Sequence, residues 1–426
     1  MKIVSSKGRR YAAPISVLSV VLAIAALMAE MTGCASRPPA NAIEIRTWYD
    51  LAAVSNNMSA NYVLENDLDA TTHGYEELAS PTANNGSGWK PIVGVNTSQP
   101  EYFTGVFDGQ GHTIRHLFIN RTDEYRVGLF HFINLFGVIK NVGLVNATVI
   151  GGVRVGSLVG QVASAFVSNC NFTGTVTGNT IVGGLVGGIW TNGIVSNCYA
   201  AGSVSGDSWV GGLVGIINEG TVTSSYCTGS VNGSASVGGL VGHIFEGTVA
   251  GSYCTGSVTG DYRVGGLVGY GNSSISDSYA TGNVIGNEWV AIGGLVGQNS
   301  RTVSNCYATG NVTGNMHGGG LIGRNDDALV SNSYATGSVT GNDEVGGLVG
   351  ANTGTVTNSF WDIETSGLPF SDGGTGKTTA EMQDIVSFLD TGWSIIGVAN
   401  SSQRNPAYTW NIVDLVTYPF LSWQQV

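Results

Sequence analysis

The sequence predicts an all-β protein, a right-handed parallel β-helix of about nine or more coils with short helical and strand caps. Three observations predict this fold: a repeat of about 27 residues, strand-like composition within each repeat, and the absence of proline from the repeats. In such a solenoid each coil packs only on its neighbours. The hydrophobic core is therefore expected to run along the stack.

The repeat is the strongest pattern in the chain. A Val-Gly-Gly-Leu-Val-Gly hexapeptide or a variant of it recurs every 26 to 28 residues, and a tyrosine column and a Gly-Asx-like turn column keep the same interval. The copies of the hexapeptide begin at Val127, Val155, Val182, Val210, Val237, Val264, Ile292, Gly318 and Val345. The tyrosine column consists of Tyr199, Tyr226, Tyr253, Tyr279, Tyr307 and Tyr334.

Each repeat contains three short segments with strand character: Gly-Leu-Val-Gly, a segment around Val-Ser-Asn-Cys-Tyr-Ala, and Gly-Ser-Val-Thr. They are too short for helices and rich in β-branched residues. A βαβ unit needs ~30 residues or more, so the repeat leaves no room for a crossover helix. Strand alternation places the tyrosine column and its small neighbours on opposite faces, and the sequence leaves open which column points inward.

Proline placement supports paired strands throughout the repeats. All nine prolines lie at or before Pro100 or at or after Pro369. Proline would remove a ladder hydrogen bond from a strand that is paired on both sides. A β-propeller is the main alternative, followed by a sandwich, but a propeller blade needs four strands in ~40 residues. The shorter repeat favours the β-helix.

The Gly-Leu-Val-Gly core and the Asn-Cys-Tyr-Ala-Thr-Gly segment, at this spacing, resemble the GLUG-motif repeats of bacterial and archaeal surface proteins. The resemblance covers about Val127 to Trp361. It implies a secreted or cell-surface protein with an adhesive or undefined role. Some immunoglobulin A peptidases carry such repeats beside a separate catalytic domain, and no such domain is recognised in this sequence.

The N-terminal segment is typical of an export signal. Residues 1–33 combine a basic start with an apolar run, and residues 34–42 form a predicted tether. Gly33-Cys34 resembles a bacterial lipobox, which implies that Cys34 carries a lipid and attaches the chain to a membrane. The expected location is the cell envelope, outer membrane or cell surface. An ordinary cleaved signal and a retained membrane anchor are the alternatives.

The rest of the chain divides into three parts. Residues 43–126 are predicted to form an N-terminal cap and first coils, residues 127–362 the repeat β-helix, and residues 363–426 a C-terminal cap. A helix opening at Thr47 and running to Ser55 is expected to close one end. Thr378 begins a capping box before a second short helix, which strands around Trp393 to Val398 and Trp410 to Trp423 would accompany at the other end.

Charge and motif content argue against several functions. With 17 basic and 29 acidic residues the formal net charge is −12, which repels phosphate backbones, so nucleic acid is not an expected partner. The glycine-rich run before Lys377 has Ser371 where a phosphate-binding loop needs glycine. His112 and His116 have zinc-protease spacing but lack the glutamate between them. We expect no cofactor, no metal site and no catalytic residues.

The cysteines are interpreted as small packing residues. Setting Cys34 aside leaves five, an odd number that cannot all pair internally. Cys170 and Cys198 share one column of adjacent coils, and Cys227 and Cys254 share another. In-register parallel strands aim both side chains of each pair alike, which favours packing over disulfides or metal binding.

Three aromatic residues are the best functional indication in the repeats. Trp209, Tyr262 and Trp289 lie just before copies of the hexapeptide, near a turn edge, where exposed rings would suit a sugar or a protein partner. Ordinary packing is the alternative. Asp207 and Asp261 are read as turn residues rather than calcium ligands.

These observations predict a non-catalytic, lipid-anchored surface scaffold that acts as an adhesin or binds an extracellular glycan or protein. The alternatives are a polysaccharide-active β-helix enzyme and a passive structural surface component. A β-helix enzyme that acts on acidic polysaccharide needs clustered charged residues, and the repeat columns contain no recurrent cluster of this kind.

Overall fold

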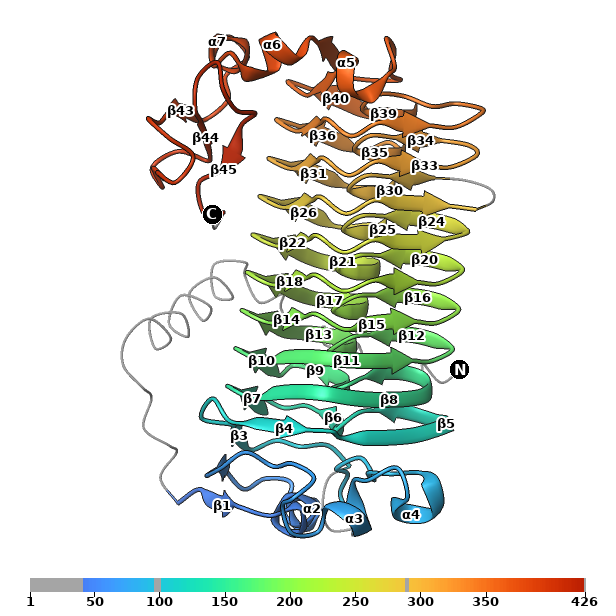
Figure 1. The fold of residues 1–426 in the computed structure, drawn as a ribbon, viewed down its shortest axis with the longest axis vertical. Coiled ribbons are helices and arrows are strands. Elements are labelled where there is room, and N and C mark those ends of the chain that lie inside the picture. The colour runs from blue at the N-terminus through green and yellow to red at the C-terminus, as the bar shows by residue number, and fades with distance from the viewer. Residues whose placement is uncertain (1–40, 96–100, 288–290, 425–426) are drawn as a thin grey trace, which may run out of the picture. The chain divides into compact units, whose positions relative to one another are not determined.

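The computed structural model describes residues 41–95, 101–287 and 291–424. Asn41–Val426 form one compact unit in which parallel strands stack coil upon coil (Figure 1). Equivalent residues of successive repeats are paired: Val182 lies opposite Val155 in the preceding coil and opposite Val210 in the following one. The predicted parallel β-helix with coils of about 27 residues is therefore confirmed.

One coil shows how the repeat folds. β16 (Ser208–Gly211) ends at a corner, and β17 (Val214–Thr223) crosses the first of two long parallel sheets. β18 (Tyr226–Cys227) and β19 (Val231–Asn232) then run along the second sheet. The next coil repeats the pattern with β20 (Ala235–Gly238), β21 (Val241–Ala250), β22 (Tyr253–Cys254) and β23 (Val258–Gly260).

Gly211 and Gly212 of the hexapeptide lie at this corner, and the sequence alone placed Gly212 inside the Gly-Leu-Val-Gly strand. A Cβ atom on Gly211 would lie 2.0 Å from the carbonyl oxygen of Val214, and one on Gly212 would lie 2.2 Å from that of Gly239 in the next coil. A Cβ on Gly215 would lie 2.6 Å from the carbonyl oxygen of Gly187 in the preceding coil. Backbone therefore packs directly on backbone, and no larger residue fits.

The second unpredicted corner divides the Ser-Asn-Cys-Tyr segment. Asn197 adopts a left-handed conformation with φ of 52°, and the equivalent positions Ser224, Gly251 and Asp277 also have positive φ. Asn, Asp and Gly tolerate this conformation better than other residues. The chain turns at this residue from the first sheet into the second.

The core is a continuous column of aliphatic side chains. Leu213 and Leu240 of adjacent coils are fully buried, as are Val210 and Val237. The same hydrophobic cluster extends from Ile45 near the first strand to Trp361 after the last repeat. Each coil buries its apolar side chains mainly against its neighbours, as expected for a solenoid.

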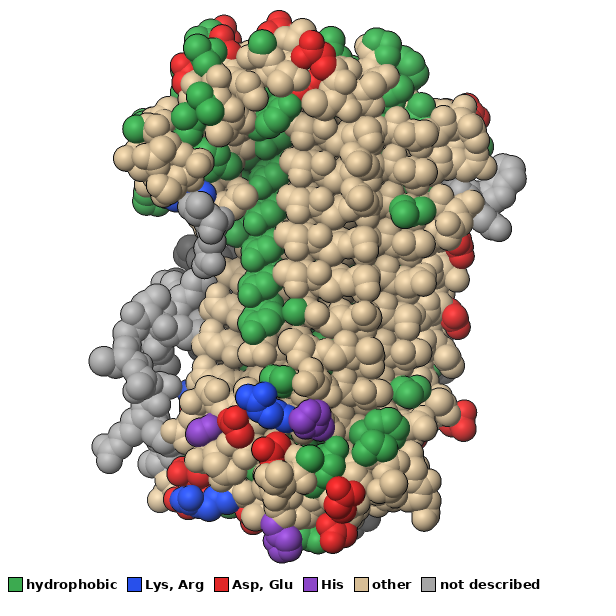
Figure 2. Space-filling view, viewed as in Figure 1, with side chains coloured by type: hydrophobic (Ala, Val, Ile, Leu, Met, Phe, Trp, Pro, Cys, Tyr) green, Lys and Arg blue, Asp and Glu red, His purple; other side chains and the backbone are tan. Residues whose placement is uncertain are grey.

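The tyrosine column points outward. The residue after each tyrosine, such as Ala200 or Cys227, is fully buried in the core. The tyrosine rings stack in register with centroids 4.8–5.1 Å apart and interplanar angles of 2–6°. We call Tyr199, Tyr226, Tyr253, Tyr279, Tyr307 and Tyr334 the tyrosine ladder. Figure 2 shows a stripe of hydrophobic side chains running along the coils over β14 (Tyr199–Ala200), β18 and β22.

The cysteines of the described chain are buried and unpaired. Cys170, Cys198, Cys227, Cys254 and Cys306 are all free thiols. Burial raises the pKa of the Cys306 thiol, which keeps it protonated. They serve as small packing residues, and the disulfide alternative is not realised.

The N-terminal cap contains the predicted helix. α2 (Trp48–Ala53) begins after Thr47, which forms a capping box with Asp50, and a 3-10 turn (Val54–Asn56) follows. Trp48 is fully buried and belongs to the core cluster of the coils, so the helix closes this end of the core. Two short helices, α3 (Tyr75–Leu78) and α4 (Ala83–Gly86), lie in the same region.

The first sheet begins before the repeats. β1 (Ile43–Ile45) pairs with β2 (Tyr62–Leu64), β2 pairs with β3 (Val106–Asp108), and β3 pairs with β7 (Val138–Lys140). These coils are irregular in length because the helices and loops of the cap are inserted between the strands. The solenoid therefore extends below the first hexapeptide.

The C-terminal cap begins directly after the last repeat. β41 (Phe360–Asp362), α5 (Ile363–Ser366) and β42 (Thr375–Lys377) are followed by α6 (Thr379–Gln383) and α7 (Val386–Leu389). The predicted capping box joins Thr378 and Glu381, but the expected single helix is divided into α6 and α7 at Asp384. The glycine-rich run before Lys377 leads into a strand paired with β41, not into a phosphate-binding helix.

The last three strands do not cover the end of the stack as predicted. β43 (Ile395–Gly397), β44 (Trp410–Ile412) and β45 (Phe420–Leu421) form a small sheet beside the coils (Figure 1). Trp410 and Trp393 pack with Tyr307, Tyr334 and Phe360 in a second hydrophobic cluster. The side chain of Trp361 instead belongs to the main core at this end.

Candidate functional site

The residue before each hexapeptide occupies a second left-handed corner. Trp209, with φ of 58°, and Arg263, with φ of 55°, are two members of this column. The backbone of Trp209 lies against Gly242 of the next coil, where a Cβ would come within 2.6 Å of the Trp209 carbonyl carbon. The glycine thus allows the corner residue's backbone to lie against the strand of the next coil.

Two of the predicted aromatic residues belong to one cluster on this face. The Trp209 and His243 rings lie 5.2 Å apart, and the His243 and Tyr270 rings 4.7 Å apart. The Arg263 guanidinium lies 4.7 Å from the centre of Tyr270 and 4.6 Å from that of Tyr262, within cation–π range. We call Trp209, His243, Phe245, Tyr262, Arg263 and Tyr270 the aromatic–arginine cluster.

His243 is a neutral side chain inside this cluster. It is 5% exposed, and neither ring nitrogen has a hydrogen-bond partner among the described residues. Burial lowers the pKa of His243 to about 4, and the positive charge of Arg263 acts in the same direction. At neutral pH the imidazole therefore acts as an aromatic packing group.

A related arrangement lies at lower coils. The Arg154 guanidinium lies 4.1 Å from the centre of the Trp190 ring and 4.5 Å from that of Tyr125. Gln161 accepts hydrogen bonds from Arg126 and Arg154 at 2.7 and 2.5 Å. Arginine and aromatic side chains thus recur along the corner.

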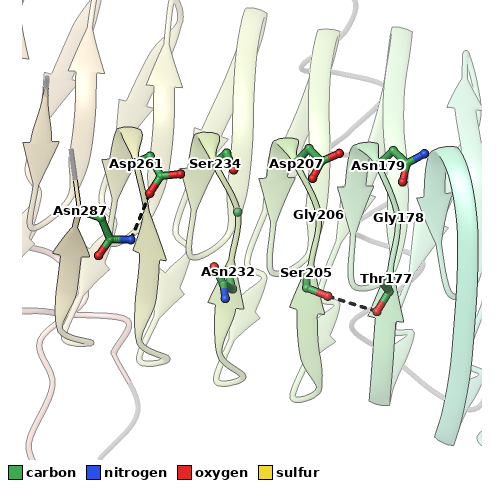
Figure 3. Close-up of a pocket in the computed structure, with 11 residues that line it drawn as sticks. Thr177, Gly178, Asn179, Ser205, Gly206, Asp207, Asn232, Ser234, Asp261 and Asn287 are labelled. Carbon is green, nitrogen blue, oxygen red and sulfur yellow. Dashed lines mark hydrogen bonds between the residues drawn. The ribbon is translucent and has the colours of Figure 1, made fainter. Parts of the chain in front are cut away.

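An open groove of about 530 Å³ lies next to the corner column, at the turn between β11 (Asn171–Thr177) and β12 (Thr180–Gly183) and at the equivalent turns of later coils. Its walls are polar side chains and glycines from successive coils, as Figure 3 shows. The lining residues at the turns are Asn179, Asp207, Ser234, Asp261 and Asn287.

The turn backbone is held between coils, which leaves the lining side chains available. The N–H groups of Asp207 and Ser234 donate to the carbonyls of Asn179 and Asp207, one coil below each. Two hydrogen bonds join lining side chains: Asn287 donates to Asp261 at 3.1 Å, and the hydroxyls of Thr177 and Ser205 lie 3.1 Å apart. Amide, hydroxyl and carboxylate groups therefore face solvent along one line.

The groove and the aromatic–arginine cluster are adjacent in the chain. Asp207 lies two residues before Trp209, and Asp261 directly precedes Tyr262. Tyr262 is 37% exposed, whereas Trp209 is partly buried against His243. Trp289 and Cys34, the other two predicted site residues, lie outside the described residues.

Sequence reasoning missed His243, Phe245 and Tyr270. His243 pairs with Ile216 in the coil below and with Tyr270 in the coil above. Lower in the same outward column stand Gln161 and Gly188, so the column carries no constant residue type. This variation was the sequence feature that could have pointed to His243 and Tyr270. A position whose residue type changes within a regular repeat is not required by the fold, so it can serve a function.

Across 41–95, 101–287 and 291–424, histidine, cysteine, aspartate and glutamate side chains nowhere gather in threes that could hold a metal ion. Within the same ranges, each helix is too short or too polar to span a bilayer.

Comparison with known families matches the GLUG motif model at residues 178–205, 260–285, 290–313 and 314–340. The chain carries GLUG repeats. Each matched GLUG segment extends over the groove-side turn or the corner of a coil. The regular backbone described above is thus the folded form of this motif.

A stretch of 165 residues is 42% identical to Halomucin from Haloquadratum walsbyi, and it spans 38% of this chain but 2% of Halomucin. A solved structure of a Bacteroides ovatus protein assigned as an immunoglobulin A1 protease is 17% identical, with a TM-score of 0.43 over 92% of this chain and 94% of that one.

Proposed function

We propose that this chain is an exported, lipid-anchored surface scaffold that binds an extended, uncharged glycan as an adhesin, without catalysing a reaction. The observation that carries the proposal is the polar groove, which crosses successive coils and includes Asp261, the residue directly before Tyr262. GLUG repeats and the similarity to Halomucin support a secreted or cell-surface location.

The shape of the groove favours a polymer. It is open and follows the stacking direction, so a chain of linked sugars can meet the same kind of turn in each coil. Amide and hydroxyl side chains such as Asn179 and Ser234 can donate to and accept from sugar hydroxyls. The partly exposed ring of Tyr262 supplies an apolar surface with a polar end.

The charges favour a neutral glycan. Asp207 and Asp261 place two carboxylates along the groove, and the whole chain has a formal net charge of −12. Both repel an anionic polymer such as a polyuronate. The same charges argue against the alternative of an enzyme acting on acidic polysaccharide.

The binding test uses the full chain immobilised on a surface, with soluble neutral polysaccharides and polyuronates as probes. We expect binding to a neutral polysaccharide and a loss of about tenfold in affinity for Tyr262→Ala. Tyr408→Ala is the matched control, since Tyr408 is 38% exposed and belongs to the C-terminal cap. Preference for polyuronate, or equal affinity in Tyr262→Ala and wild type, contradicts the proposal.

The anchor test concerns Cys34. Cells fed a labelled fatty acid should incorporate the label into the wild-type chain but not into Cys34→Ala, which should be released into the medium. Cys306→Ala is the control, because Cys306 is a buried thiol in the repeats. Label retained by Cys34→Ala would show that the anchor is elsewhere.

A further inference from the structure

Among the described residues, the C-terminal cap covers only part of the tyrosine ladder. Tyr307 and Tyr334 are 4% and 1% exposed beneath the C-terminal cap, and Tyr279 is 6% exposed. Tyr199, Tyr226 and Tyr253 are only partly buried, and Tyr253 lies at the edge of the cover, where its ring is 6.3 Å from that of Trp423. The same in-register stack of rings thus has a covered and an uncovered part.

Two tryptophans of the cap dock on the ladder column in the same way. The Trp423 ring lies 5.8 Å from Tyr279, and its indole N–H donates to the carbonyl of Asp277 at 3.1 Å. The Trp393 ring lies 5.9 Å from Phe360, and its indole donates to the carbonyl of Asn358 at 2.8 Å. In both cases the acceptor is the left-handed corner residue two positions before the aromatic residue of that coil.

Ladder hydroxyls complete this interface. Tyr334 donates to the carbonyl of Pro419 at 2.6 Å, and Tyr307 bonds to Gln424 Oε1 at 2.9 Å. Over successive coils, the cap therefore contacts three features of the ladder column: a ring, a corner carbonyl and a phenol hydroxyl.

The uncovered coils repeat all three features. The Tyr199–Tyr226 and Tyr226–Tyr253 rings stack at 4.9 and 4.8 Å. Their corner residues Asn197 and Ser224 have φ of 52° and 48°, and the covered corner at Asp277 has 49°. The surface on which the cap tryptophans pack thus continues, without cover from the cap, over the coils of Tyr199 and Tyr226.

We infer that the uncovered ladder, formed by Tyr199 and Tyr226, binds a tryptophan-bearing extended segment of another protein. The continuity of this surface with the covered interface supports that occupant. Sugars are disfavoured, because neighbouring tyrosines occupy one another's ring faces and leave mainly edges and hydroxyls. The equivalent segment of a second copy is disfavoured, since each copy holds it on its own ladder. This surface is separate from the proposed glycan groove.

The test uses a labelled peptide with the sequence of residues 418–424, Tyr-Pro-Phe-Leu-Ser-Trp-Gln, added to the full chain. We expect saturable binding, measured by fluorescence anisotropy, that the same peptide with alanine for tryptophan does not show. Tyr226→Ala should weaken binding about tenfold, and Tyr226→Phe, which keeps the ring edge, should weaken it less. Tyr408→Ala should bind as wild type.

Four outcomes of the peptide experiment would overturn the inference. They are no peptide binding, equal binding of the alanine peptide, competition by the neutral polysaccharide, and wild-type affinity in Tyr226→Ala with unchanged circular dichroism. A concentration-dependent dimer that Tyr226→Ala abolishes would also overturn it, because the occupant would then be a second copy. Competition by the polysaccharide would place the glycan on the ladder, whereas the other results do not bear on Tyr262 and leave the glycan proposal to its own test.

Discussion

The tyrosine ladder and the aromatic–arginine cluster are both outward-facing aromatic surfaces of the same coils, yet they are built in opposite ways. The ladder repeats one residue type in register, each tyrosine opposite the next. The cluster joins different residue types, and Trp209 and Tyr262 occupy different columns two coils apart. Repeating one residue type in every coil produces a uniform surface along the stack. Changing the residue type between coils produces a site confined to a few coils.

The two surfaces also differ in how they are stabilised. The ladder gains from stacked pairs, each worth about 0.5–1.5 kcal/mol, and from the cover of the C-terminal cap. The cluster depends on cation–π contacts of Arg263 and on the burial of the uncharged His243 ring. The stability of the ladder should therefore fall most when the C-terminal cap is loosened. The stability of the cluster should fall most at acid pH.

The largest expected effect comes from uncovering the ladder with Trp410→Ala. Trp410 is fully buried and packs on Trp393, Tyr307 and Tyr334. Its truncation should cost about 3–5 kcal/mol. Hydrogen exchange should show this loss in residues 385–424 and not in the central coils. A uniform loss of protection along the whole stack would mean that cap and ladder unfold as one unit.

Alkaline pH should separate the covered from the uncovered tyrosines. Burial raises the pKa of Tyr334 well above its ordinary value, and it raises the pKa of Tyr226 as well. The folded state favours the neutral phenol, so this stability is present below pH ~10 and is lost as pH rises further. Phenolate absorbance should rise in two stages, the second coinciding with release of the cap. Tyr334→Phe should diminish the second stage; a single stage would contradict the difference in cover.

Acid should destabilise the cluster and leave the ladder intact. The pKa of His243 is lowered to about 4, so its contribution is complete above the unfolded value of ~6.5 and is lost as pH falls through 4. The shift corresponds to about 3 kcal/mol. Urea unfolding at pH 7 and pH 4 should show this loss in wild type but not in His243→Phe, which keeps an aromatic ring. Equal acid sensitivity of both proteins would place the effect in other groups.

The smallest effects come from single exposed rings. Tyr226→Ala removes stacking contacts on both sides and should cost about 1–2 kcal/mol. Tyr262→Ala removes one cation–π contact and should cost about 0.5–1 kcal/mol. Thermal unfolding compares the two variants. A larger cost for Tyr262→Ala would mean that the cluster, not the ladder, is the stronger aromatic surface.

The sequence predicted what the repeat determines. The spacing of Val182 and Val210 predicted their pairing, and the cap at Thr47 and the capping box at Thr378 marked the starts of two helices. It could not show that Gly211 and Gly212 form a corner, because short Val- and Gly-rich segments read as strand. Nor could alternation alone decide that Tyr226 points outward and Cys227 inward.

The candidate site was only partly predictable. Trp209 and Tyr262 were singled out by their residue type, but their link through His243 and Tyr270 depends on which coil lies above which. The groove likewise joins Asn179 to Asn287, 108 positions later in the chain, through side chains that read individually as ordinary turn residues. The residues that cover the ladder lie outside the repeats. The repeat pattern therefore could not predict that the C-terminal cap packs on the tyrosines.

The glycine corners make the number of coils adjustable. Each corner contacts its own coil and the coils directly before and after it, so duplication of one 27-residue unit would leave every other corner unchanged. The C-terminal cap would still pack on the last coils, because Phe388 and Trp393 of the cap contact Phe360, which follows the last repeat. Every duplicated unit would therefore lengthen the bare strip of tyrosines by one ring and the polar groove by one turn. Growth by duplication increases the valency of both surfaces while both ends of the molecule stay the same.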